Sequence, residues 1–494
     1  MKRIPKLLSK TKLMRGFRCQ KCIYLTIHRP ELEPPVTPEL QALFDQGNLV
    51  GETARTYLPG GKLVDCKPWE FGDALAKTRD LIADGTETIY EAAFEYMGCY
   101  ARADIIQYSK TTERWSIYEV KSTTSVKPEH IQDVGLQTWI MAKSGLPIEK
   151  IHIMHLNRDC RFPQLDNLFL KVDVTNEMRE HYPSVQPSVK TIFETISKNK
   201  EPDVELGPHC LEPNGCQFTA HCWKDMPTPS IFNLPGIRDR KWELFQEGIV
   251  ALDDKRLTDL NDTQARIVNC FKTGERYIDA PAIQEAISTW EFPLVFLDFE
   301  TINPAIPRYD GTGPYQQVPF QFSVHILESL TADCTHQEFL FTESSDPRPD
   351  LITALLKACG TAGSIVAYYG KFEAARISEM AVFSPEHSDA LLALNARIVD
   401  PLPIFRAAVY DNAFQGSFSL KYVTPAILGD EQSYTGMDVA NGGEAQRAFA
   451  EMIASKTTTE RKKALELGLK DYCCKDTLVM ADLVKWLYKQ TLSA

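Results

Sequence analysis

The chain has 494 residues, of which 44% are hydrophobic and 24% charged, and its formal net charge is -12. At roughly 150 residues per domain, this length predicts about three domains rather than a single core. The acidic balance excludes passive attraction of a polyanion by the whole surface, so any nucleic acid must bind in a local basic groove. The sequence also lacks an apolar run of roughly 18 residues, which excludes an ordinary membrane-spanning helix.

The N-terminal segment MKRIPKLLSKTKLMRGFRCQKC is basic, and Glu31 is the first acidic residue of the chain. Because this segment has no apolar block of the secretory type, we interpret it as a basic edge of the first domain. The 13 cysteines are odd in number and scattered along the chain, which argues against a disulfide framework. Ligation of a metal or cluster is the alternative use of these thiols.

Residues 1–228 mix helical and strand patterns and end in a run that contains several cysteines and prolines. Within them, RADIIQYSKTTERWSIYEVKS has two strand patterns around a polar turn, which predicts a hairpin that brings Asp104 close to Glu119 and Lys121. Glu119 and Lys121 are two apart on a strand and therefore face the same side. Carboxylates can hold a metal ion that activates water, and a neighbouring ammonium group can stabilise the phosphate in the transition state.

The order of Asp104, then Glu119-x-Lys121, then a helix that carries Gln137 resembles the PD-(D/E)XK nucleases, in their RecB-like branch. The resemblance implies a restriction-endonuclease-like fold for residues 1–228. It also implies that Asp104 and Glu119 hold Mg²⁺ or Mn²⁺, and that Lys121 and Gln137 belong to the same catalytic site.

The RecB-like branch often has a histidine or glutamate upstream of the hairpin that completes the metal shell. Glu52, in QGNLVGETA, matches that position, and Glu91 is the alternative.

Three cysteines near the end of this domain, Cys210, Cys216 and Cys222, have the spacing C-x5-C-x5-C, and Cys19 lies in the basic N-terminal segment. Thiolates at such spacing can converge on one metal centre. The pattern is similar to that of the RecB-like nucleases related to the CRISPR adaptation exonuclease and to AddB-type repair nucleases. That similarity implies a 4Fe-4S cluster that joins the two ends of the domain and has a structural role. Zn²⁺ is the alternative, with His209 and His221 as further ligands and Cys22 as the substitute for Cys19.

Residues 229–291 carry helical apolar spacing between turn residues and predict a helical connector. From 292 to 494, strand patterns such as FPLVFLDFE, QFSVHIL and SIVAYYG alternate with helical ones. This order predicts an α/β domain in which helices cover a mixed sheet.

The strand FPLVFLDFE carries Asp298 and Glu300 two residues apart, so both carboxylates lie on one face. Their repulsion is costly unless a divalent cation lies between them, and oxygen ligands suit Mg²⁺ or Mn²⁺ rather than zinc. In the closing helix, Tyr472 and Asp476 are four apart and therefore share a face.

Three segments together, DFET at 298–301, YYGKFEAAR at 368–376 and YCCKD at 472–476, resemble the DnaQ-like 3'-5' exonucleases of the DEDD class, tyrosine subtype. The resemblance implies an RNase H-like fold in which Asp298, Glu300 and Asp476 hold two metal ions. It also implies that Tyr472 orients the attacking water.

The second of these segments departs from the usual pattern, because Glu373 stands where an aspartate is usual and Tyr369 where an asparagine is usual. We choose Glu373 as the remaining acidic ligand, with Asp400 in ARIVDPLPIF as the alternative. The adjacent Cys473 and Cys474 are expected to be buried packing residues. Three aromatic residues after DFET either stack on bases near the site or pack within their loop; they are Tyr309, Tyr315 and Phe320.

The whole chain resembles an uncharacterised bacterial family in which a RecB-like, cluster-bearing nuclease domain is fused to a DnaQ-like exonuclease domain. This resemblance implies a cytoplasmic, metal-dependent nuclease that acts on single-stranded DNA or DNA ends. A nucleic-acid-binding protein with one or both sites inactive, and an exonuclease acting on RNA, are the alternatives. A helicase or another DNA-processing partner is left open.

Overall fold

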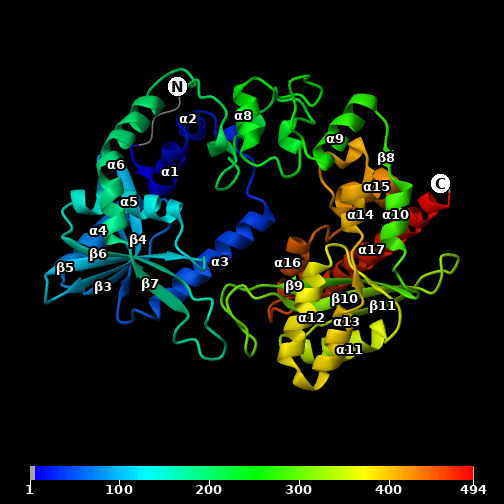
Figure 1. Cartoon of the computed structure of the whole chain (residues 1–494). Coiled ribbons are helices and arrows are strands. Elements are labelled where there is room, and N and C mark those ends of the chain that lie inside the picture. Colours follow the sequence, from blue (N-terminus) through cyan, green and yellow to red (C-terminus); the bar gives the residue numbers. More distant parts are fainter. Residues whose placement is uncertain (1–5, 493–494) are drawn as a thin grey trace. The chain divides into compact units, whose positions relative to one another are not determined.

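A computed structural model describes residues 6–492, and the chain divides into two compact units. The first unit extends to Asp225 and also includes Pro304–Tyr315, whereas the second comprises Met226–Asn303 and the chain from Gln316 onward. Both units combine helices with a sheet (Figure 1), so the predicted α/β fold class is confirmed.

The first unit is built on a sheet with the strand order β2-β3-β4-β5-β6-β7, and β1 pairs with β4. The strands are β1 (Leu8–Ser9), β2 (Lys62–Leu63), β3 (Thr88–Tyr96), β4 (Cys99–Ser109), β5 (Arg114–Lys121), β6 (Ile148–Leu156) and β7 (Phe169–Asp173). The helices are α1 (Lys10–Arg18), α2 (Gln20–His28), α3 (Pro38–Arg55), α4 (Phe71–Ala83), α5 (Pro128–Lys143), α6 (Thr175–Ile196) and α7 (Thr219–Cys222). The predicted hairpin is β4–β5, which pairs antiparallel with Ile105 opposite Tyr118.

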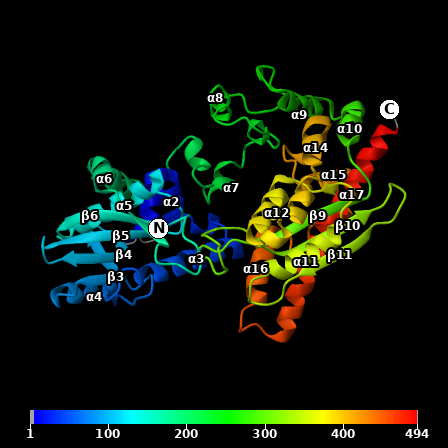
Figure 2. The same cartoon turned by 60° about the horizontal axis from the view of Figure 1, so that its bottom comes forward.

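Alternation along β5 decides which side chains reach the candidate site. Trp115 and Ile117 point into the core formed with α1, α2, α5 and α6, and α5 and α6 lie together on this face of the sheet (Figure 2). Glu119 continues the same row and is buried, because strand side chains repeat every two residues. The other face is covered by α3 and by the segment Pro304–Tyr315, whose Ala305 is buried in that second core.

The second unit contains a mixed sheet with the strand order β11-β10-β9-β12-β13. The strands are β9 (Leu294–Ile302), β10 (Val318–Leu327), β11 (Thr335–Leu340), β12 (Ile365–Val366) and β13 (Ile398–Val399). β10 is antiparallel to β9 and to β11, whereas β12 is parallel to β9 and to β13. The helices that follow are α11 (Arg348–Cys359), α12 (Lys371–Phe383), α13 (Ser388–Asn395), α14 (Leu402–Ala408), α15 (Leu420–Leu428), α16 (Gly442–Met452) and α17 (Thr459–Thr491).

The two faces of this sheet have different character. Val295, Leu297 and Phe299 of β9 pack against α11, α12 and α13 in a wholly apolar core. The alternate residues Asp298 and Glu300 lie on the opposite face, along which α17 runs (Figure 1). The alternation of β9 therefore separates the core from the carboxylates, as the sequence predicts.

Residues 229–291 contain α8 (Arg240–Gln246), α9 (Asp262–Thr273) and α10 (Ala280–Ile287), so the expected helices are present. They pack with α14 and α17 in one core, and β8 (Tyr277–Ile278) pairs with β14 (Val409–Tyr410). Gly416 lies so close to this segment that an added Cβ would be 1.8 Å from the Asn233 carbonyl oxygen. The segment is thus part of the second unit.

Candidate metal centres

Four carboxylates of the second unit form what we call the acidic cluster: Asp298, Glu300, Glu373 and Asp476. Asp298, Glu300 and Glu373 line one cavity, and Asp298 and Asp476 line another together with Tyr472. Glu300, Glu373 and Asp476 are all buried. Strand β9, helix α12 and helix α17 therefore bring the sequence-predicted acids together.

Burial and mutual repulsion shift the pKa values of the whole acidic cluster upward. Desolvation is the largest cause for Asp298 and Glu300, followed by the charge of Asp476, and the pKa of each carboxyl rises well above its usual range. Burial also raises the pKa of Glu373 to about 8 and that of Asp476 to about 6. Four acids that resist ionisation side by side are an environment that a divalent cation would relieve.

The donor set of the acidic cluster fits a hard divalent cation. Asp298, Glu300 and Cys473 offer ligand atoms that all lie within 4.8 Å of one another. Within residues 6–492, Glu373 Oε2 is buried without a hydrogen-bond partner, and a metal ion would satisfy it. Oxygen donors dominate the set, which favours Mg²⁺ or Mn²⁺.

Two tyrosines stand next to Asp476, and the sequence indicated only one of them. The Tyr434 hydroxyl donates a hydrogen bond to Asp476 Oδ1, and hydrogen bonds from Tyr434 and Tyr472 both act to lower the pKa of Asp476 against the effect of burial. The two rings pack edge to face with centroids 6.0 Å apart. Tyr434 precedes Asp476 by 42 residues, so no local spacing could have identified it.

The alternative acid, Asp400, has a structural role. Its carboxylate accepts hydrogen bonds from the backbone amides of Tyr369 and Gly370, both at 3.1 Å, and from that of Leu402 at 2.9 Å. Both carboxylate oxygens are thus engaged in holding a turn, whereas Glu373 lines the cavity of Asp298 and Glu300. The geometry favours Glu373 as the fourth acid.

The turn held by Asp400 presents Tyr369 to solvent. Tyr369 has a positive φ of 63°, which is uncommon for a residue with a side chain. Its side chain borders both cavities beside Asp298 and remains 56% exposed. A strained backbone that holds an exposed aromatic ring at a carboxylate site is a candidate ligand contact.

The aromatic residues expected near the site are packed instead. Phe320 is fully buried and stacks on Phe449 with centroids 3.9 Å apart, and Tyr309 is also buried. The Tyr315 hydroxyl donates a hydrogen bond to the backbone oxygen of Ser122 within the first unit. Of the two alternatives for these residues, the packed loop is the one that the structure supports.

The first unit brings together the predicted acids and lysine of the hairpin. Asp104 Oδ2 accepts a 2.6 Å hydrogen bond from the Val120 amide, and Lys121 Nζ lies 2.9 Å from Glu119 Oε1 and 2.5 Å from Asp133 Oδ2. Burial, followed by the charge of Glu119, raises the pKa of Asp104 well above its usual range. Asp104, Glu119 and Lys121 thus form one site, as expected from the hairpin.

A second lysine, which sequence reasoning missed, shares this site. Lys10 Nζ lies 2.7 Å from Glu119 Oε1, 3.1 Å from Asp133 Oδ2 and 2.7 Å from Gln137 Oε1. Gln137 is therefore beside the site, where the resemblance to RecB-like nucleases puts it. Sequence separation hid Lys10, because it precedes Glu119 by 109 positions.

The predicted upstream ligand Glu52 does not join this group. It is exposed on α3, about 200° around the helix from Val50, which is buried against the sheet. After burial and the charge of Glu119, the charge of Glu91 also raises the pKa of Asp104, and the Glu91 carboxylate is paired with Arg55 at 2.9 Å. Glu91, the alternative ligand from the sequence, is thus nearer to Asp104 than Glu52 is.

The carboxylates of this site are paired with lysines, unlike those of the acidic cluster. Within the described part of the chain, Glu119 Oε2 is buried without a hydrogen-bond partner, which fits a metal ligand. Glu119 Oε1 and Asp133 are, however, already paired with Lys10 and Lys121. The carboxylates here are largely neutralised by side chains, so a divalent ion has less repulsion to relieve.

Five cysteines from both ends of the first unit surround one small cavity: Cys19, Cys22, Cys210, Cys216 and Cys222. A hydrogen bond from Cys22 is the main cause that lowers the pKa of Cys216 to about 6. The cavity thus gathers Cys19 and Cys22 of the N-terminal segment with the three cysteines near the end of the unit, as the sequence predicts.

The two histidines of the zinc alternative have other neighbours. His221 Nε2 lies 3.4 Å from Glu201 Oε1. His209 borders the cysteine cavity, and its Nε2 is 3.6 Å from Cys210 Sγ. Of these two histidines, His209 is therefore the one that borders the cysteine cavity.

Both units are thus α/β folds with a group of neighbouring carboxylates, and comparison with known proteins adds two similarities. Residues 295–419 match a protein family described as a domain of unknown function, DUF2779. That stretch contains Asp298, Glu300 and Glu373 but ends before α17. The chain is also similar to the "Uncharacterized protein MG366 homolog" of Mycoplasma pneumoniae (strain ATCC 29342 / M129 / Subtype 1), with 27% identity over 205 residues that cover 38% of this chain. The chain spans 31% of that relative's length.

The sequence has no apolar run long enough for a membrane-spanning helix, and the helices of the structure can be compared with that prediction. Within residues 6–492, every helix is too short or too polar to cross a bilayer.

Proposed function

We propose that this protein is a metal-dependent nuclease that hydrolyses phosphodiester bonds at the acidic cluster of its second unit, with single-stranded DNA or DNA ends as substrate. The observation that carries the proposal is the grouping of Asp298 with the buried acids Glu300, Glu373 and Asp476 around adjoining cavities. Four carboxylates held close together repel one another and destabilise the fold unless a bound cation compensates their charge. Such groups are therefore typical of functional sites. The resemblance of the order of its motifs to that of the DnaQ-like exonucleases supports the same conclusion.

Each residue of the second site has a role that follows from its contacts. Asp298, Glu300, Asp476 and Glu373 would hold Mg²⁺ or Mn²⁺, which supplies Lewis-acid stabilisation of the attacking and leaving oxygens. Tyr472, beside Asp476, is suited to orient the attacking water. Tyr434 fixes the orientation of the Asp476 carboxylate by its hydrogen bond, so it is a positioning residue.

Tyr369 is suited to hold the substrate. Its exposed ring borders both cavities next to Asp298, and an aromatic face stacks on any base without sequence preference. Phe372 and Gln446 line the first of these cavities and would limit how far a nucleotide enters.

The first unit would contribute a second phosphodiesterase centre of the RecB-like kind. Asp104 and Glu119 would be its ligands for Mg²⁺ or Mn²⁺, and Lys121 its phosphate-stabilising cation. A 4Fe-4S cluster on Cys19, Cys210, Cys216 and Cys222 would join the ends of this unit and thereby stabilise it.

End-labelled single strands test this proposal with each site disabled separately. With Mn²⁺ or Mg²⁺, Asp298→Asn should abolish release of nucleotides from the 3' end, whereas Asp389→Asn, an exposed aspartate of α13, should behave as wild type. Lys121→Ala should abolish a second cleavage pattern that Lys143→Ala, on the same helix-covered side of the unit, leaves intact. Loss of all cleavage in only one of the two site variants would contradict a dual nuclease.

A second candidate function applies to the first unit alone, namely binding of nucleic acid without hydrolysis. Lys10 favours it, because this lysine already neutralises Glu119 and Asp133. If Asp298→Asn removes all metal-dependent hydrolysis while the protein still binds single strands, the first unit binds nucleic acid and is not a second catalytic centre. Hydrolysis of RNA in preference to DNA would change the substrate but not the site.

A further inference from the structure

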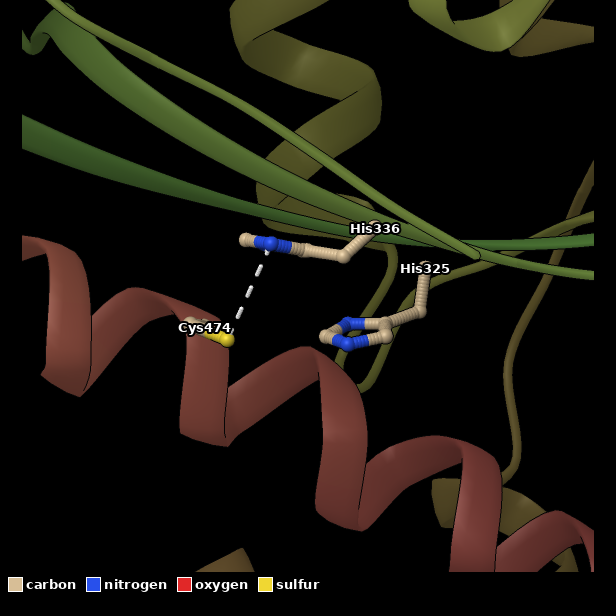
Figure 3. A group of neighbouring side chains, drawn as sticks. All are labelled: His325, His336 and Cys474. Atoms are coloured by element: carbon tan, nitrogen blue, oxygen red, sulfur yellow. Dashed lines mark hydrogen bonds between the residues drawn. The ribbon is translucent and has the colours of Figure 1, made fainter. Parts of the chain in front are cut away.

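His325, His336 and Cys474 form a group outside the acidic cluster (Figure 3). His325 on β10 and His336 on β11 are directly opposite each other in the antiparallel pair, and their rings stack with centroids 4.5 Å apart. Cys474 reaches them from α17, with its Sγ 4.0 Å from His336 Nδ1. The expectation that Cys474 is a buried packing residue is therefore wrong, since it is half-buried beside a histidine.

A chain of hydrogen bonds orients both imidazoles. His336 Nε2 is 3.0 Å from Ser323 Oγ, Ser323 Oγ is 2.7 Å from Thr477 Oγ1, and His325 Nδ1 is 2.8 Å from Thr477 Oγ1. Thr477 Oγ1 also lies 3.1 Å from the backbone oxygen of Cys474. That oxygen can only accept, so the Thr477 hydroxyl donates to it and accepts from Ser323 and His325.

This order fixes the tautomers of both rings. Ser323 donates to Thr477, so Ser323 must accept from His336 Nε2–H, while His325 donates from Nδ1–H. The lone pairs then remain on His336 Nδ1 and His325 Nε2. Histidine ligands of metal ions are oriented in this way, with the second ring nitrogen donating to a fixed acceptor.

The three side chains match a borderline divalent cation. Their ligand atoms all lie within 4.8 Å of one another, and two imidazoles with one thiolate are donors that suit Zn²⁺ far better than Mg²⁺. His336 is exposed, which gives an ion a path to the site.

We propose that His325, His336 and Cys474 bind one Zn²⁺-class ion that joins α17 to β10 and β11, separate from the Mg²⁺ or Mn²⁺ of the acidic cluster. The carboxylate of Glu338, two residues from His336 on β11, lies 3.7 Å from Lys470 Nζ, so the three named side chains form the ligand set. The proposal depends on these contacts and not on the nuclease activity.

The position of this group gives the ion a structural consequence. Cys473, adjacent to Cys474, has its Sγ 3.8 Å from Asp298 Oδ2, and Thr477 is adjacent to Asp476. A bound ion would therefore hold the turn of α17 that presents Asp476 to Asp298. Its role is that of a structural tie, and the acidic cluster keeps the chemistry.

Metal binding by the full chain tests the proposal. Zinc-free protein with Cys22→Ser and Cys216→Ser, which leaves three thiols around the cysteine cavity of the first unit, should show thiolate-to-cobalt charge transfer when Co²⁺ is added. Adding Cys474→Ser should remove that band, and adding His336→Ala should weaken Zn²⁺ binding by about 100-fold or more, beyond the effect of losing an outer partner. Cys334→Ser, at a half-buried cysteine just before β11, is the matched control and should keep both.

The outcomes separate cleanly. His336 is exposed, so His336→Ala keeps the test valid if Cys474→Ser fails to fold. If the Cys22→Ser, Cys216→Ser protein shows no thiolate-to-cobalt band, or if adding Cys474→Ser or His336→Ala leaves that band unchanged, the site does not exist.

Discussion

Removing one charge from the acidic cluster should make the metal-free protein more stable, and Glu373→Gln is the sharpest case. Burial raises the pKa of Glu373 from 4.5 to about 8, which corresponds to about 5 kcal/mol at 1.36 kcal/mol per pH unit. The folded-state pKa is above the unfolded one, so ionisation of Glu373 costs nothing below pH 4.5. The cost grows through that interval and is complete above about pH 8. Glu373→Gln abolishes it.

Thermal unfolding in EDTA measures this cost directly. At pH 8.5, Glu373→Gln should melt on the order of 10 °C above wild type, because about 2–4 °C accompany each kcal/mol in a unit of this size. At pH 6 the advantage should shrink to about 2 kcal/mol, since only the interval from 4.5 to 6 then contributes. Saturating Mn²⁺ should raise the melting temperature of wild type more than that of the variant.

The exposed Glu328, next to the end of β10, supplies the control Glu328→Gln, which should melt as wild type at both pH values. The reasoning fails if Glu373→Gln melts no higher than wild type at pH 8.5, or if its advantage is the same at pH 6.

Three further changes test other parts of the structure. Tyr369→Ala should raise KM for single strands by about 10-fold or more with little change in kcat, because stacking contributes about 1–3 kcal/mol per base; Tyr369→Phe should retain the wild-type KM, and equal effects of both would exclude stacking. Cys216→Ser in anaerobically purified protein should lose iron and sulfide and lower the unfolding temperature of the first unit, whereas Cys66→Ser should not; iron-free wild type would remove the cluster proposal. Gly416→Ala should destabilise the second unit by about 2 kcal/mol or more, because φ is 80° and the new Cβ would meet the Asn233 carbonyl; unchanged unfolding would mean that the segment at Asn233 does not pack there.

Local periodicity explains which parts of the site were predictable. Asp298 and Glu300 share a face because strands alternate, and Tyr472 and Asp476 share one because they are one helical turn apart. Both rules need only a few consecutive residues. The β4–β5 hairpin and the long closing helix follow from the same kind of information.

Partners far apart in sequence were beyond such rules. Lys10 and Tyr434 each complete a site through a contact across the fold, and neither lies in a pattern that distinguishes it from other lysines or tyrosines. Glu52 shows the converse error: its position in the sequence matched a motif, but the turn of α3 that carries it points its side chain to solvent. The environment of Phe320 was equally unpredictable, because a strand side chain can face either solvent or a packed helix. Here it stacks on Phe449 of α16.

The segment Pro304–Tyr315 also determines when the first unit can finish folding during synthesis. It is part of the first unit, with the Gly311 amide hydrogen-bonded to the Phe162 oxygen and the Phe162 amide to the Thr312 oxygen. During synthesis the first unit therefore stays incomplete after Asp225 has emerged, until about 90 further residues, which include β9, have followed. At 5–20 residues per second, this delay lasts roughly 5 to 20 s. Throughout it, the core around Ala305 is open to solvent, and a chaperone has that long to act.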